Sequence, residues 1–266
     1  MNSPHTHPGR ARRSRIALAL ATGAAALLIV LPTAGATGST PSTKATAKTA
    51  AVSFPHAFSL TNAKIGHWAV VVKNVAVHAK PTLGSHVVTT LGMVTGDGTQ
   101  NLVLILGGIN VTKSKTWYQV RLAILPNNST GWVPSTALGD LYVVHTHLYV
   151  NREAHTATLK KDGRVIFTTS VGNGLSPNIT PAGQYYVRDK LTGYNDPVYG
   201  PLAFGTSARS VTLIDSWPGG AYVGIHGTNE PQLIPGYISH GCIRLHDDAI
   251  VKLGKLMTVG TPVTIT

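Results

Sequence analysis

Hydrophobic and polar positions alternate in short runs through most of the chain after residue 66, and Gly, Pro and Asn separate the runs. A period of two is typical of strands that bury one face. We therefore predict strands over residues 68–78, 87–94, 102–106, 117–122, 131–134, 141–150, 156–159, 165–171, 183–187, 221–225 and 262–266.

Two local signals refine this pattern. Asp162-Gly163 predicts a tight hairpin turn between two of these strands. Asp247 is expected to cap a short helix that runs to about Met257, with apolar residues on one face, and Gly260 follows its end. The predicted fold class is therefore mainly all-β, with a short C-terminal helix.

A boundary near Gly139-Asp140 divides the chain into two β domains. Several short strands at regular spacing predict a small barrel over residues 67–139. Its W-Y-x-V run at Trp117 and G-W-V-P run at 131–134 resemble a bacterial SH3-like domain, a module often found on wall-active enzymes. We expect Trp117 and Trp132 to lie in the core rather than to form a ligand platform.

The first 36 residues have the order of a secretory signal peptide: four arginines, an apolar run over 16–31, and Ala34-Gly35-Ala36. The run is shorter than the ~20 residues that comfortably span a bilayer, so we expect cleavage after Ala36, with an uncleaved membrane anchor as the alternative. In both cases the folded part is predicted to be extracytoplasmic, in the cell wall or at the outer face of the membrane. Residues 37–66 predict a flexible tether rich in Thr, Ala, Ser and Lys.

The formal net charge of +12 lies mostly in the N-terminal part of the chain. Four positive charges precede residue 16, residues 37–140 hold eight basic and two acidic residues, and residues 141–266 hold ten and eight. Without a basic run interleaved with aromatics, nucleic acid is not an expected partner. Anionic wall polymers and peptide carboxylates suit this balance, although it could also serve solubility alone.

The single cysteine, Cys242, lies in the run Ser239-His240-Gly241-Cys242-Ile243-Arg244. An exported protein normally pairs its cysteines or has none, so a lone thiol points to a reactive role. His226 lies sixteen residues upstream and provides a base for a Cys–His pair. We predict that Cys242 is a nucleophile; a buried, inert thiol is the alternative.

The run from His226 to Thr228, a loop, and then Ser239 to Arg244 resembles the signature of the YkuD-type L,D-transpeptidase catalytic domain. The T-P-A-G-Q-Y segment at 180–185 resembles another conserved segment of that family. The resemblance spans about residues 141–266. It implies a β-sandwich-like domain whose cysteine attacks a carbonyl of a peptidoglycan stem peptide, forms a thioester and passes the acyl group to an amine. A second stem peptide, a protein amine or water could be the acceptor, and water would give L,D-carboxypeptidase activity.

The resemblance also assigns roles. It makes His226 the general base and acid, and since Gly227 stands where many members have serine, a backbone carbonyl would have to orient the ring. We expect His240 and Gly241 to shape the site, and the N–H groups of Gly241 and Cys242 to face the oxyanion.

Arg244 follows the nucleophile by two residues, so in a strand it would face the same side and could bind a substrate carboxylate. The alternative is that Arg244 only pairs with the neighbouring Asp247 or Asp248. Tyr222 and Ser239 complete the predicted substrate contacts.

Four other functional classes fit the sequence less well than an L,D-transpeptidase: a metal site, a sortase, a papain-like hydrolase and a non-catalytic wall protein. No metal or other cofactor is predicted, because no H-E-x-x-H or C-x-x-C motif is present; His145 and His147 are expected on the exposed face of a strand. A sortase-like transpeptidase would have a T-L-x-T-C motif and a longer His–Cys spacing. A papain-like hydrolase would have its cysteine before its histidine. A non-catalytic peptidoglycan-binding wall protein remains an alternative, although every chemical position of the signature is filled.

Overall fold

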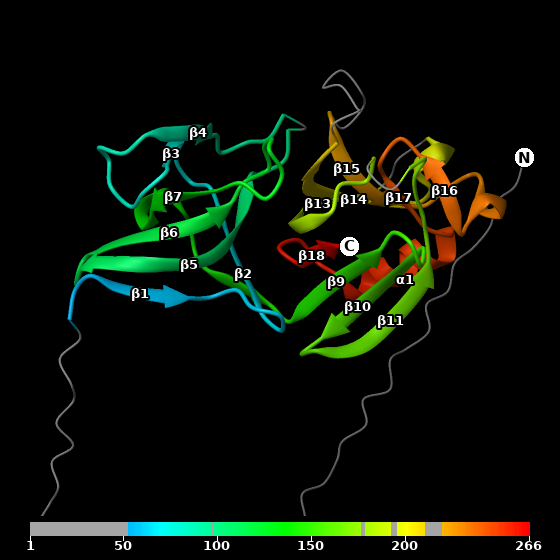
Figure 1. Ribbon diagram of the computed structural model, residues 1–266, viewed down its shortest axis with the longest axis horizontal. Coiled ribbons are helices and arrows are strands. Elements are labelled where there is room, and N and C mark those ends of the chain that lie inside the picture. Colours follow the sequence, from blue (N-terminus) through cyan, green and yellow to red (C-terminus); the bar gives the residue numbers. More distant parts are fainter. Residues whose placement is uncertain (1–52, 97, 177–178, 193–195, 211–219) are drawn as a thin grey trace, which may run out of the picture. The chain divides into compact units, whose positions relative to one another are not determined.

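The computed structural model describes residues 53–96, 98–176, 179–192, 196–210 and 220–266, which belong to one compact unit, Ala50–Thr266. These residues are mainly β-strand with one α-helix, which confirms the predicted class (Figure 1). The predicted signal segment at 1–36 and residues 37–52 of the predicted tether lie outside the described residues. No described helix has the length and apolar character needed to cross a membrane.

The first sheet is antiparallel and has eight strands in the order β4-β3-β7-β6-β5-β2-β8, with β1 paired to β5. Its core contains fully buried Val77, Ile105, Trp117 and Val120. Trp117 therefore lies in the core as expected, whereas Trp132 is only half-buried. The likeness of this region to an SH3 domain stays a prediction. The strands are β1 (His56–Ser59), β2 (Gly66–Val70), β3 (Val75–His78), β4 (Val87–Leu91), β5 (Leu102–Thr112), β6 (Lys115–Arg121), β7 (Thr130–Pro134) and β8 (Tyr142–Val144), and the 3-10 helix η1 (Ser135–Ala137) follows β7.

Strand β5 corrects two predictions. It runs to Thr112 instead of ending before Gly107, because β1 pairs alongside it, with Ser59 opposite Gly107. A Cβ on Gly107 would overlap the carbonyl oxygen of Phe58, so this glycine admits a neighbouring strand and does not end its own. The predicted tether is consequently too long, since the sheet already begins at His56.

Two predicted strands are each split in the structure. Residues 68–78 form the end of β2 and all of β3, and residues 141–150 form β8 and β9. Strand β8 pairs with β2 in the first sheet, so the change from one sheet to the next falls at His145 and not at Gly139-Asp140. The sequence pattern did not reveal this change of sheet, because buried apolar residues continue on both sides of His145, at Val144 and Leu148.

The second sheet has ten strands in the order β11-β10-β9-β18-β13-β14-β15-β17-β12-β16. Its pairs β9–β18, β15–β17 and β12–β16 are parallel. The predicted hairpin is confirmed, since Lys161 pairs with Arg164 and both Asp162 and Gly163 have positive φ. The strands are β9 (Thr146–Asn151), β10 (Thr156–Lys161), β11 (Arg164–Ser170), β12 (Gly172–Gly174), β13 (Gly183–Thr192), β14 (Leu202–Arg209), β15 (Tyr222–His226), β16 (Gly236–Ser239), β17 (Ile243–Arg244) and β18 (Pro262–Ile265), with 3-10 helices η2 (Pro197–Tyr199) and η3 (Pro231–Leu233).

The helix α1 (Asp247–Leu256) covers the core of the second sheet with Ile250 and Leu253, both fully buried, as the pattern predicted. Its N-cap residue is His246, so the prediction that Asp247 caps the helix was wrong. Asp247 lies in the first turn, and its carboxylate accepts a hydrogen bond from the backbone N–H of Thr228 at 3.0 Å. The helix start is thereby tied to the chain that follows β15.

The two histidines at the start of the second sheet differ in burial. His145 is exposed, as predicted, and its Nδ1 lies 2.7 Å from Asp162 Oδ1. His147 is buried, which corrects the prediction of an exposed position. Strand β9 lies between β10 and β18, and there the His147 ring bonds to Thr264 of β18.

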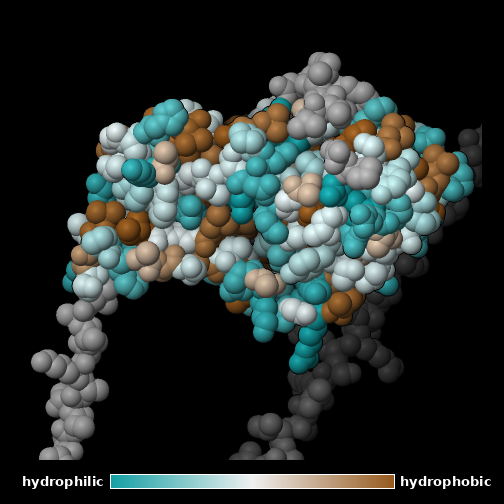
Figure 2. All heavy atoms as spheres, viewed as in Figure 1, coloured by the Kyte–Doolittle hydropathy of each residue, from teal (hydrophilic) through white to brown (hydrophobic). Residues whose placement is uncertain are grey.

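Hydrophobic and hydrophilic residues are interspersed on the face of the molecule shown in Figure 2. Strand β11 lies at one edge of the second sheet and leaves Val165 and Ile166 exposed. Such a mixed surface is normal for a soluble β protein, because apolar atoms make up more than half of a typical protein surface.

Candidate active site

Strand β15 carries one face of the candidate site. Tyr222, Gly224 and His226 alternate along the strand and so point to one side of the sheet. Val223 and Ile225 point to the other side and are fully buried in the core. Because the core fixes Val223 and Ile225, it also fixes the direction of the three site residues.

The thiol lies beside this face. Cys242 directly precedes β17, which runs parallel to β15 with Ile243 opposite Ile225. The backbone N–H of Gly224 donates to the Cys242 Sγ at 3.3 Å. A Cβ on Gly224 would lie 3.6 Å from that sulfur and 3.5 Å from the His226 Cδ2, so both reactive groups lie over Gly224. No direct Cys242–His226 hydrogen bond is present among the described residues, and such bonds often tighten only when substrate binds.

One nitrogen of the His226 ring is fixed by the backbone. Nδ1 lies 2.6 Å from the carbonyl oxygen of Gly227. A carbonyl can only accept, so Nδ1 carries the hydrogen and Nε2 keeps a lone pair. This confirms the expectation that a backbone carbonyl orients the ring. A Cβ on Gly227 would overlap the Asp247 carboxylate, which explains why a serine has no room at this position.

Burial keeps the acid–base pair neutral. It lowers the pKa of His226 to about 4, a shift that the Gly227 hydrogen bond opposes and the positive charge of Arg244 reinforces. Burial also raises the pKa of the Cys242 thiol, against the Gly224 N–H and Arg244. At neutral pH the site therefore holds a thiol and a neutral imidazole instead of a thiolate–imidazolium pair. Cys242 as a residue is half-buried.

The loop that presents the thiol is held by two hydroxyl groups. Gly241 has φ +136°, a conformation that favours glycine. The Ser239 hydroxyl accepts the Gly241 N–H at 3.1 Å and donates to the Cys242 carbonyl at 2.6 Å. The Thr180 hydroxyl donates to the Gly241 carbonyl at 2.8 Å and accepts the Gly174 N–H at 2.9 Å. Together these bonds fix the backbone on both sides of Gly241.

These bonds change the roles expected from the sequence. Ser239 is buried with its hydroxyl inside the loop, where it shapes the site, and its contact with substrate stays a prediction. The Gly241 N–H is already engaged by Ser239, and the oxyanion contact of the Cys242 N–H stays a prediction. His240 is exposed on the same loop. Thr180 was missed as a site residue, although it opens the T-P-A-G segment that the sequence had singled out.

Arg244 lies opposite His226 in the parallel β15–β17 register, so its side chain shares the face of the site. Its Nη1 lies 2.9 Å from Glu230 Oε2, so the alternative in which Arg244 pairs only with Asp247 or Asp248 does not hold. The Asp247 carboxylate instead faces Thr228. The Arg244 Nε is buried and has no hydrogen-bond partner among the described residues.

Tyr222 lies two positions from Gly224 on the site face, as the prediction of a substrate contact requires. The guanidinium groups of Arg188 and Arg209 lie 4.0 Å and 4.6 Å from its ring centre, and its hydroxyl donates to the Ala123 carbonyl at 3.3 Å. The sequence could not identify these arginines because they come from two other strands. They place two positive charges against the ring of Tyr222.

The histidines considered as metal ligands are engaged elsewhere. His145 bonds to Asp162, and His147 bonds to Thr264. Within the described ranges, no group of three or more His, Cys, Asp or Glu side chains is placed to hold a metal ion. The arrangement thus offers a nucleophile, a base and positive charge as its chemical groups.

Comparisons with known proteins match the part of the chain that contains this site. The sequence model of the YkuD L,D-transpeptidase catalytic domain matches residues 145–265, which span β9 to β18. The YkuD and YqjB proteins of Bacillus subtilis (strain 168), whose names place them among the L,D-transpeptidases, are each 32% identical over 128 and 135 residues. Each match covers 48% of this chain, and it covers 70% of YkuD and 72% of YqjB. A crystal structure of an Enterococcus faecium L,D-transpeptidase variant is 25% identical, with a TM-score of 0.36 over 46% of this chain. This chain spans about half (49%) of that solved chain.

Proposed function

Because the chain belongs to the YkuD family of L,D-transpeptidases, we propose that it is an exported enzyme that transfers acyl groups from peptidoglycan stem peptides. The observation that carries this proposal is the placement of the Cys242 sulfur and the His226 ring over Gly224, with Arg244 on the same face. Export rests on the signal pattern of the first 36 residues. The role of the enzyme would be cross-linking or remodelling of the cell wall.

The first half-reaction forms a thioester. The Cys242 sulfur attacks a carbonyl carbon of the stem peptide while the thiol proton moves to the His226 Nε2, the nitrogen that keeps its lone pair. The carbonyl oxygen becomes negative and accepts a hydrogen bond from the Cys242 N–H. The C–N bond then breaks, and His226 returns the proton to the leaving amine.

The second half-reaction reverses these steps with a new acceptor. An amine attacks the thioester, His226 removes its proton, and the C–S bond breaks to restore the thiol. A second stem peptide gives a cross-link, a protein amine attaches that protein to the wall, and water gives L,D-carboxypeptidase activity.

A neutral thiol and imidazole fit this sequence of steps. Since burial disfavours both charged forms, the proton transfer accompanies the attack instead of preceding it. Arg244 lowers the energy of the negative sulfur, because its charge opposes the rise in the thiol pKa. The charge of Arg244 therefore stabilises the negative charge that develops on the Cys242 sulfur, and no permanent thiolate–imidazolium pair is needed.

Arg244 would also bind a carboxylate of the stem peptide. Its present partner Glu230 has a side chain that is 47% exposed, so it can move into water and release the Arg244 Nη1 for the ligand. Tyr222 and its two arginines would bound the substrate on the other side of the thiol. The basic N-terminal part would favour contact with anionic wall polymers.

Mass spectrometry with a tetrapeptide-stem muropeptide tests the proposal. Wild type should show a covalent adduct equal to the muropeptide without its leaving amine, and the released products identify the acceptor. Cys242→Ala should show neither. An Arg244→Ala variant should lose turnover of the muropeptide far more than reaction with a small, uncharged thiol reagent.

The same experiment can reject the proposal. Binding of the muropeptide by wild type without adduct or product would favour a non-catalytic wall-binding protein. Turnover only of a protein substrate would favour a sortase-like transpeptidase. An adduct of equal yield in Cys242→Ala would remove Cys242 from the mechanism.

A further inference from the structure

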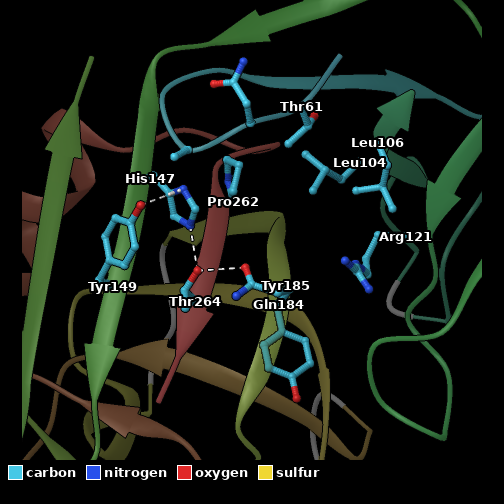
Figure 3. Close-up of a pocket in the computed structure, with 12 residues that line it drawn as sticks. Thr61, Leu104, Leu106, Arg121, His147, Tyr149, Gln184, Tyr185, Pro262 and Thr264 are labelled. Atoms are coloured by element: carbon cyan, nitrogen blue, oxygen red, sulfur yellow. Dashed lines mark hydrogen bonds between the residues drawn. The ribbon is translucent and has the colours of Figure 1, made fainter. Parts of the chain in front are cut away.

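A cavity of about 350 Å³ is lined by residues other than those of the Cys242 site (Figure 3). Residues of β5 and β6 line it on one side, and residues of β9, β13 and β18 line it on the other. None of the site residues described above is among its lining residues. It is large enough for a small ligand, since ligand pockets start at roughly 300 Å³.

A chain of hydrogen bonds on one wall has a fixed direction. The single hydroxyl hydrogen of Thr264 is donated to Gln184 Oε1 at 2.8 Å. Thr264 must therefore accept from His147 Nε2, also at 2.8 Å, and the Tyr149 hydroxyl lies 3.3 Å from His147 Nδ1. Burial lowers the pKa of His147 to about 4, and a hydrogen bond to the backbone of Ala63 opposes this shift. Figure 3 shows the chain as dashed lines.

Because the hydrogen bonds run in this direction, N–H groups of Gln184 and Arg121 have no acceptor among the described residues. The carbonyl of Gln184 is engaged by Thr264, so its NH₂ group remains, and the residue is exposed, so a ligand can reach it. Arg121 lies across the cavity from this chain in Figure 3. Its Nη1 donates to the Asn128 carbonyl at 2.7 Å, while its Nε is buried and lacks a partner among the described residues.

The charge of the cavity is not balanced by its walls. Burial lowers the pKa of Arg121, but a guanidinium stays charged in proteins. Neither Asp nor Glu is among the lining residues. A partly buried cation without an acid is costly, and a bound anion would offset that cost. A carboxylate suits a guanidinium best, because its two oxygens match the planar fork of donors.

The remaining walls indicate what the carboxylate is attached to. Leu104, Leu106 and Pro262 line the same cavity and form its apolar part. We propose that this cavity binds the free carboxylate of an amino acid or of a short peptide's C-terminus, held between Arg121 and Gln184. A small apolar side chain of the ligand then contacts Leu104 and Leu106. This proposal does not depend on the chemistry at Cys242.

Titration of the full-length Cys242→Ala protein tests this site without covalent chemistry. The probes are N-acetyl-D-alanine and its neutral amide, N-acetyl-D-alaninamide, followed by backbone amide chemical shifts. The acid should give saturable shifts around residues 121, 184 and 264, and the amide should not. Arg121→Gln should weaken binding of the acid by at least about tenfold, since hydrogen bonds to charged groups contribute roughly 1.5–3 kcal/mol.

Two further variants keep the test decisive. Gln184→Leu removes the second set of donors without changing the charge and should weaken binding severalfold, which matters if Arg121→Gln fails to fold. Arg164→Gln removes an exposed arginine of β11 and should leave binding unchanged. Three results would each overturn the proposal: equal binding of acid and amide, no saturable shift with the acid, or loss of binding in Arg244→Gln but not in Arg121→Gln.

Discussion

His226 at the Cys242 site and His147 at the Arg121 cavity are both buried, and burial lowers the pKa of each to about 4. The difference lies in what their nitrogens meet. At His226 a backbone carbonyl takes one nitrogen, and the other keeps its lone pair on the side of the thiol. At His147 the hydroxyl groups of Thr264 and Tyr149 lie beside the two nitrogens, and the ring also bonds to the backbone of Ala63. Burial alone thus makes a histidine neutral, and only the arrangement around the second nitrogen makes it a base.

The largest expected effect separates these two histidines in catalysis. His226→Ala should slow acylation of Cys242 by roughly 10²–10⁴-fold at neutral pH, because the proton acceptor is lost. His147→Ala should change the rate little. Raising the pH towards the pKa of the thiol should restore part of the His226→Ala rate, since hydroxide then forms the thiolate. Rapid-mixing kinetics with a carbapenem would measure both rates; an unchanged rate in His226→Ala would move the base role to His240.

A smaller effect is expected from the hydroxyl that holds the Cys242 loop. Thr180→Val removes the bond to the Gly241 carbonyl, and the displaced loop should slow acylation on the order of tenfold to a hundredfold. Thr146→Val is the matched control, because Thr146 is also buried and bonds through its hydroxyl, to Thr261, away from the loop. Both variants should lose about 1–3 kcal/mol of unfolding free energy. If acylation fell equally in both, a general loss of stability would explain it.

The sequence predicted the parts of this molecule that depend on near neighbours. The Asp162-Gly163 turn and the apolar face of α1 are both local and were confirmed. The expectation that a backbone carbonyl orients His226 was also confirmed, and the partner is the very next residue.

Predictions that depended on distant residues failed. Strand β5 passes through Gly107 because β1, some fifty residues earlier, pairs with it. His147 is buried because β18, from the end of the chain, pairs beside it. A pattern of alternation tells which face is apolar, and it does not tell which strand lies alongside.

The smallest expected effect is on stability at acid pH. The folded-state pKa of His147 is about 4, below its unfolded value of 6.5, so the unfolded chain binds more protons between these values. Stability should therefore fall as the pH drops from about 6.5 to about 4, and this contribution should level off below that range. His147→Gln should remove on the order of 1 kcal/mol of that fall. Denaturant unfolding across this range would measure the slopes, and parallel slopes for wild type and His147→Gln would contradict the assignment.

The central claim is that Cys242 is the nucleophile, and intact-protein mass spectrometry after exposure to a carbapenem tests it most directly. Carbapenems acylate the cysteine of L,D-transpeptidases, so wild type should gain the mass of one molecule. Cys242→Ala should gain none while its thermal unfolding stays close to that of wild type, because within the described part of the chain the sulfur accepts a hydrogen bond only from the Gly224 N–H. An adduct of the same mass and yield on the folded Cys242→Ala variant would contradict the account.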